Sequence, residues 1–247
     1  MDRWQNKVAV VTGASSGIGA SIVEKLVKAG LVVVGLARRV ELCDNIKNRL
    51  DSEQQARLRF KYCDVGDNKS VGEAFEHICK IYGGVDVLVN NAGCARGGLL
   101  ANMDVKDIQA VVNTNVMGVV YCTQAAVKSM KDREFNGHIF HINSVLGHSV
   151  VRTEIGAANI YPATKYAVTA MTDVLRHELN IMKTKIKITS ISPGLVNTEI
   201  VNDKVKEFNQ ERILQPDDIA EGILYALGTP PHVQVQELTI RPVGELF

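Results

Sequence analysis

Apolar and polar residues follow each other along this chain in two different rhythms. Uninterrupted apolar runs rich in Val and Ile predict seven strands, over residues 8–13, 31–37, 58–65, 85–93, 137–144, 186–194 and 235–242. Elsewhere apolar residues recur every three or four positions and predict helices, most clearly over 17–29, 105–131 and 161–182. Strands that are apolar throughout belong to parallel sheets whose crossover helices cover both faces. We therefore predict one α/β domain over residues 1–247, with a doubly wound, parallel, seven-stranded sheet.

Composition narrows the class of protein. The 247 residues carry 28 Lys and Arg against 27 Asp and Glu, which leaves no basic surplus for a nucleic-acid partner. The five cysteines never form Cys-x-x-Cys, which favours reduced thiols in a cytoplasmic protein over disulfides or a zinc site. The first residues are polar and no apolar run reaches membrane-spanning length. We therefore expect neither a signal peptide nor a membrane span.

A glycine-rich turn, TGASSGIG, joins the first predicted strand to the first helix. Gly13 allows a tight turn, Gly17 lets a pyrophosphate approach the backbone, and Gly19 permits close packing of helix on strand. The helix N-terminus would offer free N–H groups to phosphate. The spacing G-x-x-x-G-x-G differs from the usual G-x-G-x-x-G, and an ordinary strand-to-helix loop is the alternative interpretation.

The end of the second strand bears on which dinucleotide would bind. Ala37 stands roughly where NAD sites carry an acid for the ribose hydroxyls, and Arg38 and Arg39 follow it. Arginine can pair with a 2′-phosphate, so the sequence favours NADP(H) over NAD. The alternative is a solvated basic pair that opens a helix. Asp64, at the end of the third strand, could hold the adenine amino group or equally cap a turn.

Further polar residues stand at or near the ends of later strands. NNAG, residues 90–93, ends the fourth strand, where small residues let the backbone lie against a cofactor. Ser144 ends the fifth strand. Asn115 lies inside the long helical pattern although Asn is a poor helix former, and a satisfied buried amide is the alternative there.

Tyr161 and Lys165 lie four positions apart at the start of a predicted helix, hence on one face. Pro162 between them is tolerated in a first turn. A cationic lysine near a phenol favours phenolate, which lowers the tyrosine pKa and makes it usable as an acid or base. Taken alone, this spacing is more typical of a surface helix.

TGASSGIG, NNAG, Asn115, Ser144, Tyr-x-x-x-Lys and SPG (192–194) fall in one order, each at a strand end or helix start, apart from Asn115. Over essentially the whole chain, this set closely resembles the short-chain dehydrogenase/reductase family. The resemblance implies that Tyr161 donates or accepts the proton, and that Lys165 lowers its pKa and holds the nicotinamide ribose. It also implies that Ser144 positions the substrate oxygen and that Asn115 orders a proton-relay water near Lys165.

The same resemblance implies an NADP(H) site. Its residues would be Gly13, Ser15, Ser16, Gly17, Ile18, Gly19, Arg38, Arg39, Asp64, Val65, Asn91, Ala92, Gly93, Tyr161, Lys165, Pro193, Gly194, Val196 and Thr198. Relatives pair through two long helices, here about 104–131 and 161–182, so a homodimer or homotetramer is expected. We expect no metal, since His138 and His141 lie three apart on a strand and therefore on opposite faces.

One departure from the family pattern concerns the substrate pocket. Ser144 and Tyr161 are 17 positions apart, several more than relatives commonly show. Residues 145–159 must therefore form a longer loop beside the substrate. His148 in this loop could touch the substrate, although a surface histidine is the simpler interpretation.

The segment after Gly194 predicts the nature of the substrate. Its apolar residues, Leu195, Val196, Ile200, Val201 and Phe208, suggest a movable lid near 195–212 over an apolar alcohol or ketone. Packing of an amphipathic helix is the alternative.

Several segments, among them INSVLGH and YPATKYAVTAMTD, most resemble insect farnesol dehydrogenases and vertebrate member 11 of the family. The resemblance favours an NADP-dependent alcohol dehydrogenase/carbonyl reductase acting on farnesol-like isoprenoid alcohols. A steroid or xenobiotic ketone reductase is the alternative. A non-catalytic nucleotide-binding scaffold is disfavoured, since it would need none of the four catalytic candidates.

Overall fold

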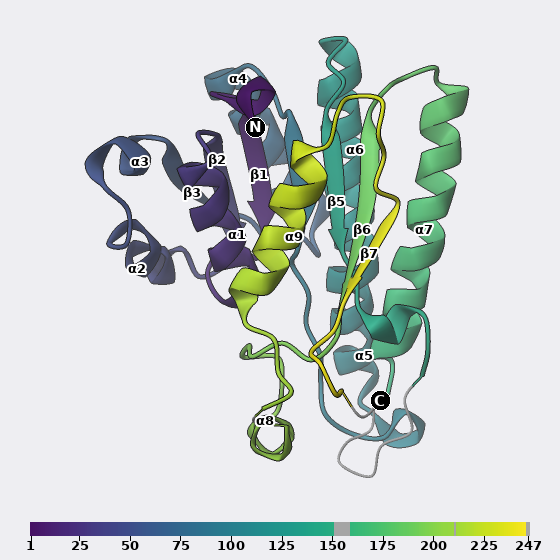
Figure 1. Ribbon diagram of the computed structural model, residues 1–247. Helices are drawn as coiled ribbons and strands as arrows, with labels where there is room; N and C mark the ends of the chain where they lie inside the picture. The colour runs from purple at the N-terminus through teal and green to yellow at the C-terminus, as the bar shows by residue number, and fades with distance from the viewer. Residues whose placement is uncertain (151–158, 210, 246–247) are drawn as a thin grey trace.

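The computed structural model describes residues 1–150, 159–209 and 211–245. In these ranges seven strands form one parallel sheet, in the order β3-β2-β1-β4-β5-β6-β7 (Figure 1). The strands are β1 (Val8–Thr12), β2 (Val32–Ala37), β3 (Leu58–Tyr62), β4 (Val87–Asn90), β5 (His138–Ile142), β6 (Lys187–Pro193) and β7 (Glu237–Ile240). The predicted doubly wound, seven-stranded parallel sheet is confirmed.

Helices cover both faces of the sheet. On one face lie α1 (Gly17–Lys28) and α9 (Pro216–Gly228), and on the other lie α4 (Asn68–Tyr82), α6 (Gly118–Asp132) and α7 (Tyr161–Ile181) (Figure 1). Shorter helices are α2 (Asp44–Lys47), α3 (Ser52–Ala56), α5 (Val105–Val112) and α8 (Asp203–Phe208). Every helix in the described ranges is too short or too polar to cross a membrane.

The centre of the sheet is buried on both sides. Ala9, Val10 and Val11 of β1 have no exposed surface. Ala9 and Val11 pack with α1 and α9, whereas Val10 packs with α4, α6 and α7, because successive strand side chains point to opposite faces. This two-sided burial explains why the strands are apolar without interruption.

The strand order reverses at β1, which pairs with β2 on one side and β4 on the other. Open parallel sheets bind ligands in the crevice at the carboxyl ends of the strands beside such a reversal. These ends point to the lower edge of Figure 1, where α8 and the C-terminal end of the chain also lie. The fold therefore gathers the predicted site residues at one edge.

The long helix predicted over 105–131 is interrupted. Between α5 and α6 the backbone widens into one π-helical turn, η4 (Asn113–Met117). Such π-turns are rare, and they are frequent at functional sites. The predicted extent is right, but the uniform helix is wrong at the turn that holds Asn115.

Candidate active site

The β1–α1 turn approaches its neighbours closely. Gly13 and Gly17 have φ angles of 64° and 53°, a region that favours glycine. A Cβ added to Gly13 would lie 2.8 Å from the Cα of Ala92, and one added to Gly19 would lie 2.2 Å from the carbonyl oxygen of Gly13. Ser16, the N-cap of α1, makes no side-chain capping bond. The first N–H groups of α1 are thus left for an anion.

Hydrogen bonds tie the ends of β1 and β4 together. The Thr12 Oγ1 accepts from the backbone N–H groups of Asn91 and Ala92, each at 3.0 Å. The Asn91 Nδ2 donates to the carbonyl oxygens of Thr12 and Gly13, at 2.9 and 3.2 Å. Asn91 therefore shapes the turn through its amide. Thr12 was missed by sequence reasoning, although a hydroxyl at the end of an apolar strand was the available signal.

The two arginines that follow β2, Arg38 and Arg39, differ in their contacts. Arg38 is exposed and has no ion-pair partner among the described residues. The Arg39 Nη2 lies 3.1 Å from the Glu199 Oε2 and 3.5 Å from the Ser16 Oγ.

Asp64 caps a turn, since its Oδ1 accepts from the Gly66 N–H at 3.0 Å. The turn-capping alternative is thus present, and a contact of Asp64 with adenine stays a prediction.

Asn115 joins two parts of the site. Its Oδ1 accepts from the Cys94 N–H at 2.9 Å, and its Nδ2 donates to the Cys94 carbonyl oxygen at 3.0 Å. The same Nδ2 donates to the Thr164 Oγ1 at 3.1 Å. Thr164 immediately precedes Lys165 in α7. The buried amide thereby holds the loop after β4 against the start of α7, and the alternative of a satisfied buried Asn is borne out for its side chain.

The structure brings Ser144, Tyr161 and Lys165 together. Tyr161 begins α7 and Pro162 stands in its first turn, as predicted. The buried Lys165 Nζ donates to the Ile142 carbonyl oxygen at 2.8 Å and lies 5.6 Å from the centre of the Tyr161 ring. The Ser144 side chain lies close enough to the Tyr161 phenol to lower its pKa. The three polar side chains thus meet at the carboxyl ends of β5 and the start of α7.

The pKa values of this group differ from the expectation. Burial raises the pKa of Tyr161 to about 12, although the nearby Ser144 hydroxyl opposes the rise. Burial lowers the pKa of Lys165 to about 8. The expected lowering of the tyrosine pKa is wrong for this structure, because the burial that disfavours phenolate also disfavours the charge of the lysine. At neutral pH Tyr161 holds its proton.

A buried polar network lies behind the site. The Asn90 Nδ2 donates to the Thr123 Oγ1 at 2.9 Å, and the His141 ring bridges the Thr123 and Thr172 hydroxyls at 3.3 and 2.8 Å. Burial lowers the pKa of His141 to about 3, so the imidazole is neutral. The network joins β4, α6, β5 and α7. His138 contacts Thr189 of the neighbouring strand β6 and stacks on Phe140, which packs with α1 and α9, so the two histidines point to opposite faces of the sheet as predicted.

The segment after β6 is fixed at its base. Val196 forms a parallel bridge with Leu214, and the Leu195 N–H donates to the Glu245 Oε1 at 2.9 Å. Between these points the chain carries α8 at the lower edge of Figure 1. Glu245 was missed by sequence reasoning. The lid near 195–212 stays a prediction, and the side chain of Phe208 lies outside the described residues.

The loop between Ser144 and Tyr161 is described only in part. Residues 151–158 of the expected longer loop lie outside the described ranges. His148 is exposed, with its Nε2 3.0 Å from the Ser192 Oγ and 3.5 Å from the Glu237 Oε1. The imidazole thus contacts β6 and β7 at the surface, as the simpler interpretation held.

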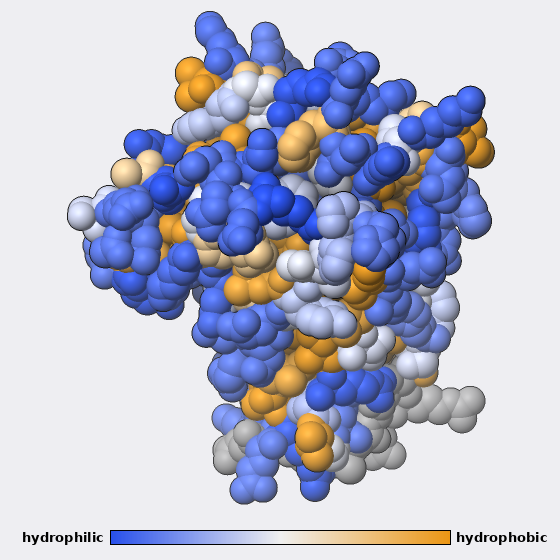
Figure 2. Space-filling view, turned by 45° about the horizontal axis from the view of Figure 1, so that its top comes forward, coloured by the Kyte–Doolittle hydropathy of each residue, from blue (hydrophilic) through white to orange (hydrophobic). Residues whose placement is uncertain are grey.

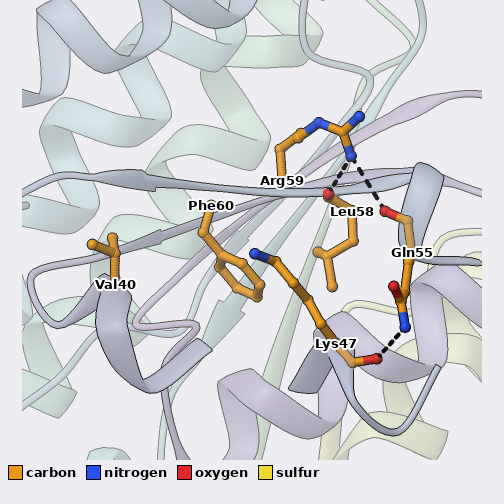
Figure 3. Close-up of a pocket in the computed structure, with 6 residues that line it drawn as sticks. All are labelled: Val40, Lys47, Gln55, Leu58, Arg59 and Phe60. Carbon is orange, nitrogen blue, oxygen red and sulfur yellow. Dashed lines mark hydrogen bonds between the residues drawn. The ribbon is translucent and has the colours of Figure 1, made fainter. Parts of the chain in front are cut away.

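A pocket of about 530 Å³ lies elsewhere, beside the outer strand β3 (Figure 3). Its lining residues are Val40, Lys47, Gln55, Leu58, Arg59 and Phe60. Arg59 donates to the carbonyl oxygens of Gln55 and Leu58, and Gln55 donates to that of Lys47. The pocket holds none of the predicted site residues, and these polar groups serve the local backbone.

A doubly wound sheet, a glycine turn at a helix N-terminus, and a hydroxyl–phenol–lysine cluster at the same edge define a nicotinamide-dependent oxidoreductase. The chain belongs to the short-chain dehydrogenase family, whose family model matches residues 7–209. The predicted family is confirmed.

Relatives match over the full length. The chain is 53% identical to a farnesol dehydrogenase of Aedes aegypti over 248 residues, covering 100% of each chain. It is 40% identical to dehydrogenase/reductase SDR family member 11 of Gallus gallus over 256 residues, again covering 100% of each. A solved serine dehydrogenase complexed with NADP⁺ is similar with a TM-score of 0.86 and 30% identity, over 97% of this chain and 96% of that one. These likenesses confirm both predicted resemblances and an oxidoreductase enzyme.

Proposed function

We propose that the protein interconverts an apolar alcohol and its aldehyde or ketone with NADP(H), and that farnesol-like isoprenoid alcohols are its preferred substrates. The observation that carries this proposal is the meeting of Ser144, Tyr161 and Lys165 beside the glycine turn. The full-length likeness to a farnesol dehydrogenase supports the substrate class.

The residues of the turn fit a dinucleotide. A Cβ at Gly13 or Gly19 would fill the space where the turn meets its neighbours, and α1 begins with no side-chain cap. Gly13, Gly17 and Gly19 would let the pyrophosphate reach the start of α1. Arg38, free of ion pairs among the described residues, and Arg39 beside it would hold the 2′-phosphate and so favour NADP(H).

Side chains of the protein itself carry out the proton transfer. Bound coenzyme supplies or takes the hydride. In the reducing direction Tyr161 gives its proton to the substrate oxygen, and its pKa of about 12 keeps that proton in place at neutral pH. Ser144 hydrogen-bonds the same oxygen. Lys165, held by the Ile142 carbonyl oxygen and 5.6 Å from the centre of the Tyr161 ring, would hold the nicotinamide ribose.

Exposed apolar side chains favour an apolar substrate. Leu99, Val150 and Ile200 are exposed and follow the ends of β4, β5 and β6 respectively. The carboxyl ends of these neighbouring strands lie at one edge, and the three residues would border the substrate region there. Apolar walls with few polar groups are typical of sites for apolar ligands.

A homodimer or homotetramer is part of the proposal. Tyr166, Val174 and Ile181 are exposed and fall on one stripe of α7. Figure 2 shows a mostly hydrophilic face with an apolar band through its middle and apolar residues at its upper right edge. Light scattering on the purified protein measures the state, and a monomer at micromolar concentration would contradict this part.

A cytoplasmic location also belongs to the proposal. The five cysteines are free thiols. Burial raises the pKa of both Cys43 and Cys63 to about 11, so these thiols stay protonated and unreactive. Fractionation of the source cells tests the location.

A substrate panel tests the function. NADP⁺ and NAD⁺ reduction are measured with farnesol, medium-chain alcohols and hydroxysteroids. We expect turnover with NADP⁺, highest for farnesol. Higher turnover with hydroxysteroids would transfer the proposal to a steroid ketone reductase, and NADPH binding without any turnover would favour the scaffold.

A further inference from the structure

Glu199 lies against Ser16 and Arg39, two residues of the predicted NADP(H) site that together are called the coenzyme corner below. Its Oε2 lies 3.1 Å from the Arg39 Nη2 and 3.4 Å from the Ser16 Oγ. A guanidinium and a hydroxyl are donors that a phosphate oxygen also uses. The corner therefore already holds an anion, and that anion belongs to the chain itself.

The position of Glu199 follows from the path of the segment after β6. The Thr198 Cγ2 lies 3.2 Å from the place of a Cβ on Gly17, so the segment passes directly over the glycine turn. Arg39 and Glu199 are 160 positions apart in sequence, yet they join the end of β2 to this segment. The ion pair thus ties the predicted lid to the coenzyme corner.

The ion pair between Arg39 and Glu199 is exposed, and a phosphate group could displace it. The side chains of Arg39 and Glu199 are 53% and 65% exposed, so solvent weakens their attraction. One carboxylate oxygen makes the contact, whereas a phosphate offers several oxygens and more charge. A phosphate dianion also repels the carboxylate that it replaces.

We propose, building on the NADP(H) function above, that Glu199 is a coenzyme-specificity residue that competes with the 2′-phosphate for Arg39. Binding of the 2′-phosphate breaks the pair and releases the segment after β6. A dinucleotide without this phosphate leaves the pair intact. The coenzyme that binds thereby sets the freedom of the segment that borders the substrate.

Binding of adenosine 2′,5′-bisphosphate and of 5′-ADP tests the competition without catalysis. Calorimetry on the full chain compares the wild type with Glu199→Gln, and with Glu207→Gln as a matched control. Glu207 is exposed on the same segment and makes no ion pair within the described ranges. We expect Glu199→Gln to tighten the bisphosphate about fivefold and to leave 5′-ADP unchanged. Unchanged or weaker bisphosphate binding would overturn the proposal.

The role of Arg39 is tested by repeating the Glu199 substitution in a protein that already carries Arg39→Gln. In Arg39→Gln the further change Glu199→Gln should tighten bisphosphate binding by clearly less than in the wild-type background, because the contested partner is gone and only the repulsion remains. A gain of the same size in both backgrounds would show plain repulsion and overturn the competition. If neither nucleotide binds the wild type, the dinucleotide site itself fails, which separates that outcome from a failure of Glu199 alone.

Hydrogen exchange over residues 197–207 measures the release. In the wild type these amides should exchange faster with the bisphosphate than with 5′-ADP, and in Glu199→Gln the difference should vanish. Equal exchange with both nucleotides in the wild type would contradict the release.

Discussion

The β1–α1 turn and the segment after β6 meet over the same site but are held in opposite ways. The turn is fixed by its backbone, with Gly13 and Gly19 so close to their neighbours that no Cβ fits. The segment after β6 is fixed at its base, where Val196 bridges Leu214 and the Leu195 N–H donates to Glu245. Beyond this base, Glu199 reaches Ser16 of the turn and forms an exposed ion pair with Arg39 after β2.

The difference follows from what each region has to recognise. Under the proposed function the pyrophosphate of the coenzyme is the same in every turnover, and a rigid backbone turn would bind it with little reorganisation. A substrate must enter and leave, so its border is formed by side chains with few fixed contacts. We therefore expect the rigid β1–α1 turn to serve the coenzyme and the more loosely held segment after β6 to serve the substrate.

The largest predicted effect comes from a substitution in the rigid β1–α1 turn. Gly19→Ala places a methyl group 2.2 Å from the Gly13 carbonyl oxygen, so we expect a loss of about 1–3 kcal/mol in the free energy of unfolding and weaker NADPH binding. Gly72→Ala is the matched control, because it lies exposed in α4 with no atom within 4 Å of its added Cβ. Chemical denaturation should show this control about 0.5–1 kcal/mol more stable than the wild type. The same sign for both variants would contradict the close approach.

A second effect concerns the neutral network behind the site. The pKa of His141 is about 3 in the fold and about 6.5 when unfolded, so the unfolded chain binds the extra proton first as pH falls. Stability is therefore lost below pH 6.5, by about 2 kcal/mol between pH 7 and 5. Denaturation of the wild type and of His141→Asn over this range measures it. His138 contributes in the same direction, so the variant should keep part of the slope. An unchanged slope would show that His141 is not the group responsible.

The smallest predicted effect comes from a substitution in the segment after β6. Ile200→Ser should change the free energy of unfolding by less than about 0.5 kcal/mol, because the side chain is exposed. It should raise the KM for farnesol up to about fivefold if Ile200 borders the substrate. Ile81→Ser, exposed at the end of α4, is the control and should leave KM unchanged. An equal KM for both variants would remove Ile200 from the substrate border.

Local patterns carried most of the fold. The apolar runs predicted the strands most clearly where β1, β2, β4, β5 and β6 are buried on both faces, whereas the edge strands β3 and β7 are partly exposed. The glycine turn was visible because Gly13 and Gly19 are required by backbone contacts. The order of the motifs also placed Ser144, Tyr161 and Lys165 together.

Long-range contacts could not be predicted in this way. The π-turn at Asn115 accompanies hydrogen bonds to Cys94 and Thr164, which are distant in sequence. The rise in the Tyr161 pKa reflects burial, which spacing along a helix does not report. The pairing of Glu199 with Arg39 depends on the path of a segment that carries no motif.

The most direct test of the proposed proton step is NADPH oxidation with the aldehyde of farnesol by the wild type and by Tyr161→Phe, with NADPH binding measured on the same preparations. Because the phenol hydroxyl moves the proton, kcat should fall about 10²- to 10⁴-fold while NADPH affinity stays within about twofold. A variant that keeps wild-type turnover would contradict the assignment of Tyr161.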